Sequence, residues 1–218
     1  MVERGQVLER MTLVRSGALE LEALFATGTS PGEPALPVVL AGPHPRFGGN
    51  MDSPVLAELV WALAAAGLPT LRFNWRGVGA SQGQTRIPPL PAAELPDLSD
   101  EVADLTAAVE QHAAGGRCSL VGYSFGAAVA ALVAAAHPSV ERLVLIAPLI
   151  GALPFDWAAL ADRGVPTALV CAELDPHALP DAVARASGRR LPVRVIAGAT
   201  HSFQRGLPEL ARVVSAAL

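Results

Sequence analysis

The chain has 218 residues, of which 51% are hydrophobic and 17% charged, and its formal net charge is −4. This composition suits a compact core and excludes an intrinsically disordered chain. The slightly acidic balance gives no reason to expect nucleic acid or a membrane surface as a partner. We see no signal peptide and no apolar stretch of spanning length, so we expect a cytoplasmic protein whose single domain covers residues 1–218.

Predicted strands and helices alternate along the chain. Residues 7–15 and 18–26 predict two strands joined by a turn, and residues 28–37 a turn-rich connector. Asp52 and Ser53 predict a capping side chain for a helix that ends near Ala66. The further strands are predicted at 37–41, 69–73, 118–121, 143–147, 167–171 and 193–196. The further helices are predicted at 98–113, 127–136, 180–186 and from 207, with an irregular proline-rich stretch at 87–96 and a short segment of unassigned type at 157–162.

This alternation indicates the fold class. Continuous apolar strands between helices are typical of a mostly parallel sheet that helices cover on both faces. We therefore expect an α/β fold, a doubly wound sheet of about eight strands. The helix at 98–113 has Val102 and Leu105 on an apolar face and is predicted to carry its acids on the other. In such a fold the catalytic and ligand-binding residues lie just beyond the carboxyl ends of the strands.

The stretch Gly122–Gly126 is a G-x-S-x-G pentapeptide between a predicted strand and a predicted helix. At such a sharp turn Ser124 is thrust out of the backbone, near the positive end of the helix, and glycines tolerate the crowded geometry. Asp175 and His201 follow two later predicted strands. The order Ser, Asp, His, each at a different strand end, is the order that a nucleophile elbow uses. Glu173 is the competing acid, two residues before Asp175.

These features resemble the α/β-hydrolase superfamily over nearly the whole chain. The stretches 73–81, 172–176 and 198–201 look like its loop after the fourth strand, its acid loop and its histidine loop. The His-Pro-rich loop Gly42–Met51 resembles that of small, cap-less, dienelactone-hydrolase-like serine hydrolases, although Gly42 stands where that branch often has a histidine. The short stretch between the strands at 143–147 and 167–171 leaves no large cap domain. The resemblance implies a serine hydrolase of esters or related acyl compounds, and an esterase above all.

The catalytic roles follow from the chemistry of acyl transfer. A serine hydroxyl is a poor nucleophile near neutral pH, so we expect His201 to remove the proton of Ser124 and Asp175 to orient the imidazole. The tetrahedral oxyanion needs preorganised donors, and the N–H of Phe125 is one. The other is expected from the loop after Ala41. Because Pro43 and Pro45 have no N–H, either His44 or Arg46 supplies it, and alignment by strand end favours His44.

Other candidates each have a structural alternative. Arg46 and Asn50 are predicted substrate contacts, with a solvated loop as the alternative. Trp75 and Phe203 are predicted walls of an acyl pocket, with plain core as the alternative. The remaining histidines look structural, and two of them end predicted helices, where a positive charge is favoured: His112, His137 and His177.

Competing functions are less well supported by the sequence. Gly77-Val-Gly79 follows a strand as in a dinucleotide-binding loop, but Gln82 occupies the third glycine position. No metal-binding motif is visible, and Cys118 and Cys171 lie in apolar strand-like runs as expected of buried free thiols. We expect no cofactor and a small-molecule acyl substrate. A thioesterase, a peptidase and a catalytically silent hydrolase fold that binds a ligand or a partner remain as alternatives.

Overall fold

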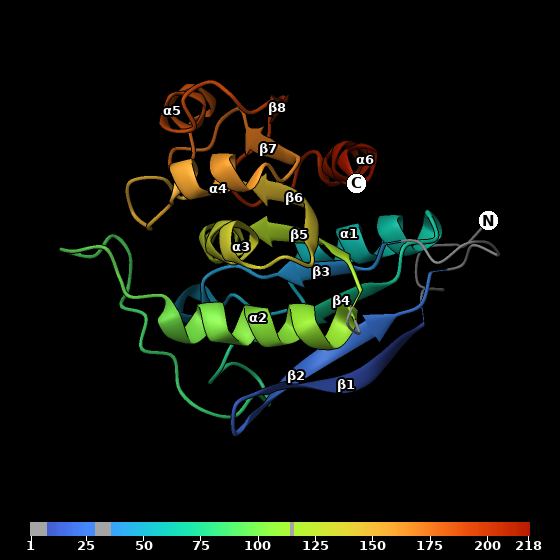
Figure 1. The fold of residues 1–218 in the computed structure, drawn as a ribbon. Coiled ribbons are helices and arrows are strands. Elements are labelled where there is room, and N and C mark those ends of the chain that lie inside the picture. The colour runs from blue at the N-terminus through green and yellow to red at the C-terminus, as the bar shows by residue number, and fades with distance from the viewer. Residues whose placement is uncertain (1–7, 29–35, 114–115) are drawn as a thin grey trace.

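The computed structural model describes residues 8–28, 36–113 and 116–218 (Figure 1). Within these residues one eight-stranded sheet runs in the order β1-β2-β4-β3-β5-β6-β7-β8. A hairpin forms one end of the sheet, with its turn at Gly17, and it pairs antiparallel with β4. All the other neighbouring strands are parallel. The predicted doubly wound, mostly parallel α/β sheet is therefore confirmed.

The helices and strands keep the predicted order, and their bounds differ from the predicted ones by a few residues. The strands are β1 (Glu9–Ser16), β2 (Leu19–Ala26), β3 (Val38–Ala41), β4 (Thr70–Phe73), β5 (Cys118–Tyr123), β6 (Val140–Ile146), β7 (Thr167–Ala172) and β8 (Val193–Ile196). The helices are α1 (Pro54–Ala65), α2 (Ser99–Ala113), α3 (Phe125–Ala136), α4 (Trp157–Arg163), α5 (Pro180–Ala186) and α6 (Leu207–Ala217), with a 3-10 turn η1 (Pro45–Phe47). Residue 7 and most of the connector 28–37 lie outside the described residues.

Helices cover the sheet on both faces. Helices α2, α3 and α4 pack side by side on one face, and α1 packs against α6 on the other (Figure 1). Strands β3, β4 and β5 are buried along their whole length, as the apolar runs of β3 and β5 predict. Among the described residues, no helix has the length and the apolar character that a membrane crossing needs.

Glycine at two positions lets α3 approach the sheet. A Cβ added at Gly122 would lie 2.3 Å from the carbonyl oxygen of Gly126, and one added at Gly126 would lie 2.3 Å from the carbonyl oxygen of Ala41. Real Cβ atoms do not come so close to backbone oxygens. The start of α3 is therefore seated directly on the ends of β5 and β3, where the candidate site lies.

Three local predictions were wrong. Ser53 precedes α1 but makes no side-chain capping bond, and it faces the cavity described below. Glu101 and Asp104 of α2 are buried rather than on a polar face, because each lies one helical turn before a residue of the apolar face. Arg76 from the β4–α2 connection pairs with Asp104 at 2.7 Å. His112 does not place a positive charge at the end of α2 near neutral pH, because burial lowers the pKa of its imidazole to about 4.

Candidate active site

Ser124 stands at the junction of β5 and α3, in a backbone conformation that is rare for a residue with a side chain. Its φ is 57° and its ψ is −114°. Such strain persists only where the surrounding structure enforces it, and it is concentrated at functional sites. The Ser124 Oγ lies 2.8 Å from His201 Nε2, and His201 Nδ1 lies 2.7 Å from Asp175 Oδ2. The fold thus brings together the three residues that the sequence places at separate strand ends.

Asp175 is held as a carboxylate although it is fully buried. Burial by itself raises the pKa of Asp175. Two hydrogen bonds outweigh this effect, one from His201 and one from the N–H of His177, which Oδ1 accepts at 2.9 Å. The pKa of Asp175 therefore lies below its usual range. Glu173, the competing acid, is exposed and accepts a hydrogen bond from the N–H of Gly198 at 2.6 Å. Asp175 is therefore the acid that contacts the imidazole, and Glu173 contacts the backbone of the loop that carries it.

The loop that carries His201 is also held by Tyr123. The hydroxyl of Tyr123 donates to the backbone carbonyl of His201 at 2.9 Å. Burial, together with the charge of Asp175, raises the pKa of Tyr123 to about 12, so its hydroxyl remains a donor at neutral pH. The ring of His177 meets the ring of His201 edge-on, with centroids 5.7 Å apart. The sequence-based interpretation of His177 as structural missed this contact, which no local pattern indicates.

The loop after β3 lies against the start of α3. The imidazole of His44 packs edge-on against the ring of Phe125, with centroids 5.1 Å apart. The indole N–H of Trp75 donates to the carbonyl of Gly42 at 3.2 Å, which fixes the beginning of the loop. Within the described part of the chain, the backbone N–H groups of His44 and Phe125 donate to no acceptor. Two donors close to Ser124 are thus free for a ligand oxygen.

His44 itself is neutral. Burial lowers the pKa of its imidazole. Its Nδ1 accepts the backbone N–H of Arg46 at 3.1 Å, which assigns the proton to Nε2. The side chain therefore caps the 3-10 turn η1 and shapes the loop around its own backbone N–H.

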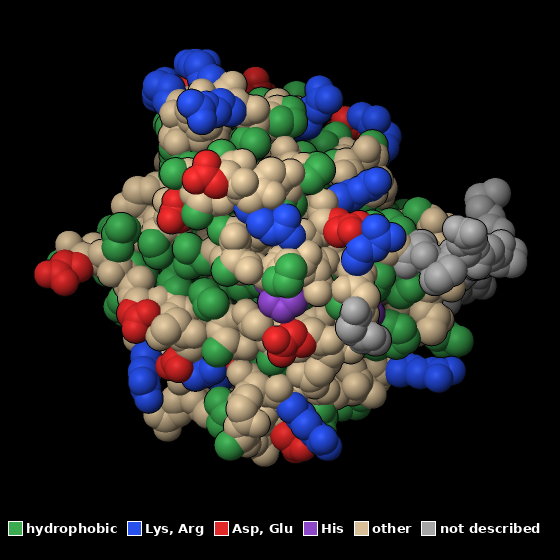
Figure 2. All heavy atoms as spheres, viewed as in Figure 1, with side chains coloured by type: hydrophobic (Ala, Val, Ile, Leu, Met, Phe, Trp, Pro, Cys, Tyr) green, Lys and Arg blue, Asp and Glu red, His purple; other side chains and the backbone are tan. Residues whose placement is uncertain are grey.

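A cavity of about 840 Å³ opens over Ser124. Figure 2 shows hydrophobic side chains gathered at the side of the molecule where the parallel strands end. The residues that line the cavity are Pro43, His44, Phe47, Gly48, Gly49, Ser53, Leu90, Pro91, Tyr123, Ser124, Leu149, Ile150, Gly151, Ala152, His177 and His201. None of these is Asp, Glu, Lys or Arg. The cavity is therefore mainly apolar, with its polar groups concentrated at the serine and the histidines.

The four predicted substrate contacts lie outside this lining. Arg46 donates to backbone carbonyls of the β4–α2 connection, and the Asn50 side chain accepts the N–H of Asp52 at 2.9 Å. Trp75 and Phe203 are fully buried in the core, Trp75 against Phe125 and Phe203 beneath Tyr123. Their predicted role as pocket walls does not fit this placement. The walls are formed instead by the pairs Leu90–Pro91 and Leu149–Ile150, in connections whose sequences have no periodicity.

The glycine loop at 77–79 is not arranged for a phosphate. The Glu22 carboxylate accepts the side-chain amide of Asn74 and the backbone N–H of Ala80, at 2.8 Å and 2.9 Å. A negative charge thus occupies the position that a dinucleotide-binding loop leaves for its ligand, which argues against that alternative.

Comparison with known proteins places this geometry in a family context. The family model described as "Serine aminopeptidase, S33" matches residues 47–201. An uncharacterized protein of Rickettsia prowazekii, RP471, is 27% identical over 89% of this chain and 82% of its own length. The solved structure of an α/β serine hydrolase homologue from Coxiella burnetii is 29% identical and superposes with a TM-score of 0.77, covering 96% of this chain and 97% of the other.

A second solved structure bears on the missing cap. XC6422 from Xanthomonas campestris, described as an α/β serine hydrolase without lid, is 22% identical and has a TM-score of 0.77 over 96% of this chain and 93% of its own. These likenesses confirm the predicted cap-less α/β-hydrolase fold.

Proposed function

Because this chain belongs to the α/β-hydrolase family described as serine aminopeptidase, S33, we propose that it is a serine esterase that cleaves carboxylic esters of uncharged, apolar acyl groups. The observation that supports this proposal most is the chain of two short contacts, Ser124 Oγ to His201 Nε2 at 2.8 Å and His201 Nδ1 to Asp175 Oδ2 at 2.7 Å. This arrangement is the one that activates a serine hydroxyl near neutral pH.

The proposed reaction proceeds in two halves. As Ser124 Oγ attacks the acyl carbonyl, His201 Nε2 takes its proton, and the Asp175 carboxylate stabilises the imidazolium. The free N–H groups of Phe125 and His44 donate to the developing oxyanion. The tetrahedral intermediate collapses as His201 gives the proton to the leaving alcohol. Water, activated by the same histidine, then attacks the acyl-enzyme, and Ser124 recovers its proton when the acid is released.

The uncharged lining of the cavity favours esters over peptides. An aminopeptidase has to hold the protonated amino group of its substrate, and a buried ammonium group without a partner is costly. The lining contains no carboxylate for that purpose, and no Lys or Arg for an anionic substrate. We therefore infer that neutral acyl esters are turned over in preference to amino-acid amides and to half-esters of dicarboxylic acids.

Labelling with a fluorophosphonate tests the nucleophile. We expect the wild-type protein to be labelled and to hydrolyse p-nitrophenyl butyrate, and Ser124→Ala to lose both, with kcat lower by several orders of magnitude. Ser202→Ala is the matched control, because Ser202 lies in the exposed turn beside His201 and its hydroxyl contacts that of Thr200 at 3.4 Å and not the imidazole. Labelling that persists in Ser124→Ala would contradict the assignment. A wild-type protein that is never labelled would favour the catalytically silent alternative.

A substrate panel tests the class. We expect p-nitrophenyl butyrate to be cleaved on the order of 100-fold faster, in kcat/KM, than alanyl p-nitroanilide and than a p-nitrophenyl half-ester of succinate. Butyryl thioesters in the same panel test the thioesterase alternative. A preference for the anilide would overturn the proposed ester specificity and support a peptidase.

A further inference from the structure

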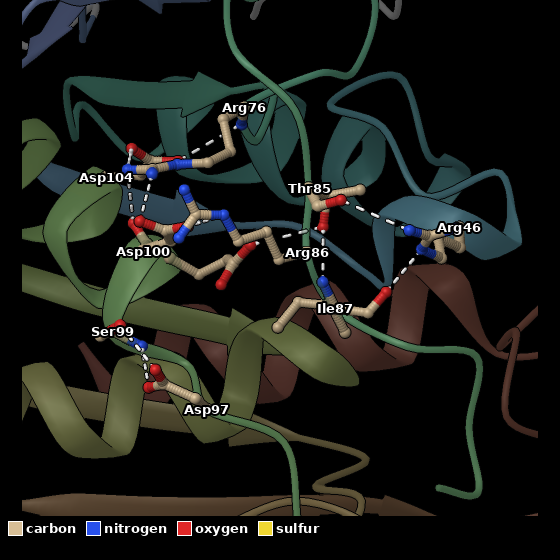
Figure 3. Close-up of polar contacts among 10 residues, drawn as sticks. Arg46, Arg76, Thr85, Arg86, Ile87, Asp97, Ser99, Asp100 and Asp104 are labelled. Atoms are coloured by element: carbon tan, nitrogen blue, oxygen red, sulfur yellow. Dashed lines mark hydrogen bonds and ion pairs between the residues drawn. The ribbon is translucent and has the colours of Figure 1, made fainter.

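Arg46 lies beside the candidate site and contacts a segment that is distant in sequence (Figure 3). Its Nε donates to the carbonyl of Ile87 at 2.5 Å, and its Nη2 donates to the carbonyl of Thr85 at 3.4 Å. The guanidinium group therefore joins the loop after β3 to the connection between β4 and α2. Both acceptors are backbone oxygens, so the contact depends on where the segment runs rather than on its side chains.

The same segment is held from its other side by α2. The hydroxyl of Thr85 lies 3.4 Å from Glu101 Oε1 and accepts the backbone N–H of Ile87 at 3.3 Å. The side chain of Ile87 is fully buried in the core. Residues 85–87 are thus fixed between α2 and Arg46, and Arg46 contacts them from the side of the loop 43–49.

The residues that follow transmit this position to the cavity. Segment 85–91 contains prolines at 88, 89 and 91, and each proline fixes its own φ. The path from Ile87 to Leu90 therefore has little conformational freedom. Leu90 and Pro91 line the cavity over Ser124, whose other lining residues include no Asp, Glu, Lys or Arg. A displacement of residues 85–87 would move this wall.

We propose that Arg46 is a positioning residue that sets the acyl-chain preference of the site, by holding segment 85–91 against the loop 43–49 so that Leu90 and Pro91 form a wall for the acyl chain. This inference rests on the proposed esterase function. Arg46 does not line the cavity, so it acts through the wall and not through contact with the substrate. An acetyl group is too short to contact this wall. A butyryl or hexanoyl chain gains binding free energy with each methylene that packs against it.

The consequence is a chain-length dependence that Arg46 controls. Burying one methylene corresponds to about a fourfold change in kcat/KM. With the wall in place, kcat/KM is expected to rise from p-nitrophenyl acetate to butyrate and hexanoate. In Arg46→Met, which keeps the aliphatic stem but removes both donors, we expect hexanoate to lose roughly tenfold more kcat/KM than acetate, mainly through KM.

Arg86→Met is the matched control. Arg86 lies in the same segment but is exposed, and its ion pair of 3.7 Å is with Asp100 of α2 and not with the loop 43–49. We expect its chain-length profile to match that of the wild type. In Arg46→Lys the single ammonium group cannot donate to both carbonyls in the geometry of the guanidinium group, so we expect an intermediate chain-length profile. This variant replaces Arg46→Met in the test if Arg46→Met does not fold.

Hydrogen exchange of the backbone separates this proposal from the proposed function. We expect the N–H of Ile87, which donates to the Thr85 hydroxyl, to exchange faster in Arg46→Met than in the wild type or in Arg86→Met. A wild-type protein that cleaves no ester would contradict the proposed function and, with it, the acyl role of the wall. An active Arg46→Met with unchanged exchange, or with an equal loss on acetate and hexanoate, would overturn the role of Arg46 alone.

Discussion

Tyr123 and His201 are 78 residues apart in sequence and are joined by a hydrogen bond of 2.9 Å from the phenol to the backbone carbonyl. Tyr123 directly precedes Ser124, so this bond ties the backbone beside the proposed nucleophile to the loop that carries the proposed base. The distance of 2.8 Å between Ser124 Oγ and His201 Nε2 depends on the relative position of these two segments.

Removing the phenol oxygen should therefore loosen the proposed base. In Tyr123→Phe the ring keeps its edge-on packing on Phe203, with centroids 6.3 Å apart, but His201 loses its anchor. We expect kcat for p-nitrophenyl butyrate to fall by about tenfold with little change in KM, and the stability to fall by about 1 kcal/mol. Steady-state kinetics and urea denaturation measure the two effects. An unchanged kcat in a folded variant would show that the bond is only structural.

Asp175→Asn should impair catalysis without disturbing the fold. The amide has nearly the same shape, but it can present an N–H to His201 Nδ1 and so favour the wrong tautomer of the imidazole. We expect kcat to fall on the order of 10³–10⁴-fold. Glu173→Gln is the control, because Glu173 contacts the N–H of Gly198 and not the imidazole. The assignment of Asp175 would be wrong if Glu173→Gln caused the larger loss.

The sequence was sufficient for the parts of the fold that depend on local pattern. Strands such as β3 and β5 are continuous apolar runs, and α5, α6 and β8 begin where the sequence predicts them. The positions of Ser124, Asp175 and His201 at strand ends followed from topology, since parallel strands carry their carboxyl ends to one edge of the sheet. This is why three distant residues could be predicted to meet.

The sequence was insufficient where a contact depends on a partner outside the element. The spacing of α2 places Glu101 and Asp104 one helical turn before Leu105 and Ala108, on its apolar face. What the pattern of α2 does not contain is the partner, since Arg76, which makes the burial of Asp104 tolerable, arrives from another connection. The cavity wall at Leu90 lies in a proline-rich stretch without periodicity. Trp75 has the size of a pocket wall, but it packs in the core behind Phe125.

Gly126→Ala should disturb the site through the backbone. The new Cβ would lie 2.3 Å from the carbonyl oxygen of Ala41, so α3 has to move away from the end of β3. We expect a loss of stability of about 1–3 kcal/mol and a fall in kcat, because the N–H of Phe125 moves with the helix. Gly42→Ala is the control, since the nearest atom to its Cβ would be Leu56 Cδ2 at 3.5 Å, which is an ordinary contact. Equal stability and activity in both variants would contradict the close approach.

Glu101 gives the protein a stability that depends on pH. Burial, with the charges of Asp104 and Asp100, raises the pKa of Glu101 from 4.5 to about 7, although Arg76 opposes this. Between these two values the folded state keeps a proton that the unfolded state releases, so this group's contribution to the free energy of unfolding falls as the pH rises from about 4.5 to 7. Glu101→Gln cannot ionise and should be more stable than the wild type at pH 8, by up to about 3 kcal/mol.

Urea denaturation at pH 5 and at pH 8 measures this difference. We expect the advantage of Glu101→Gln to be small at pH 5 and to grow toward pH 8, while Glu94→Gln, a change at an exposed position of the β4–α2 connection, follows the wild type at both values. The amide also keeps the contact with Thr85, so segment 85–91 should retain its position and the variant its activity. A Glu101→Gln variant that is less stable than the wild type at pH 8 would show that the carboxylate is ionised and stabilising in the folded protein.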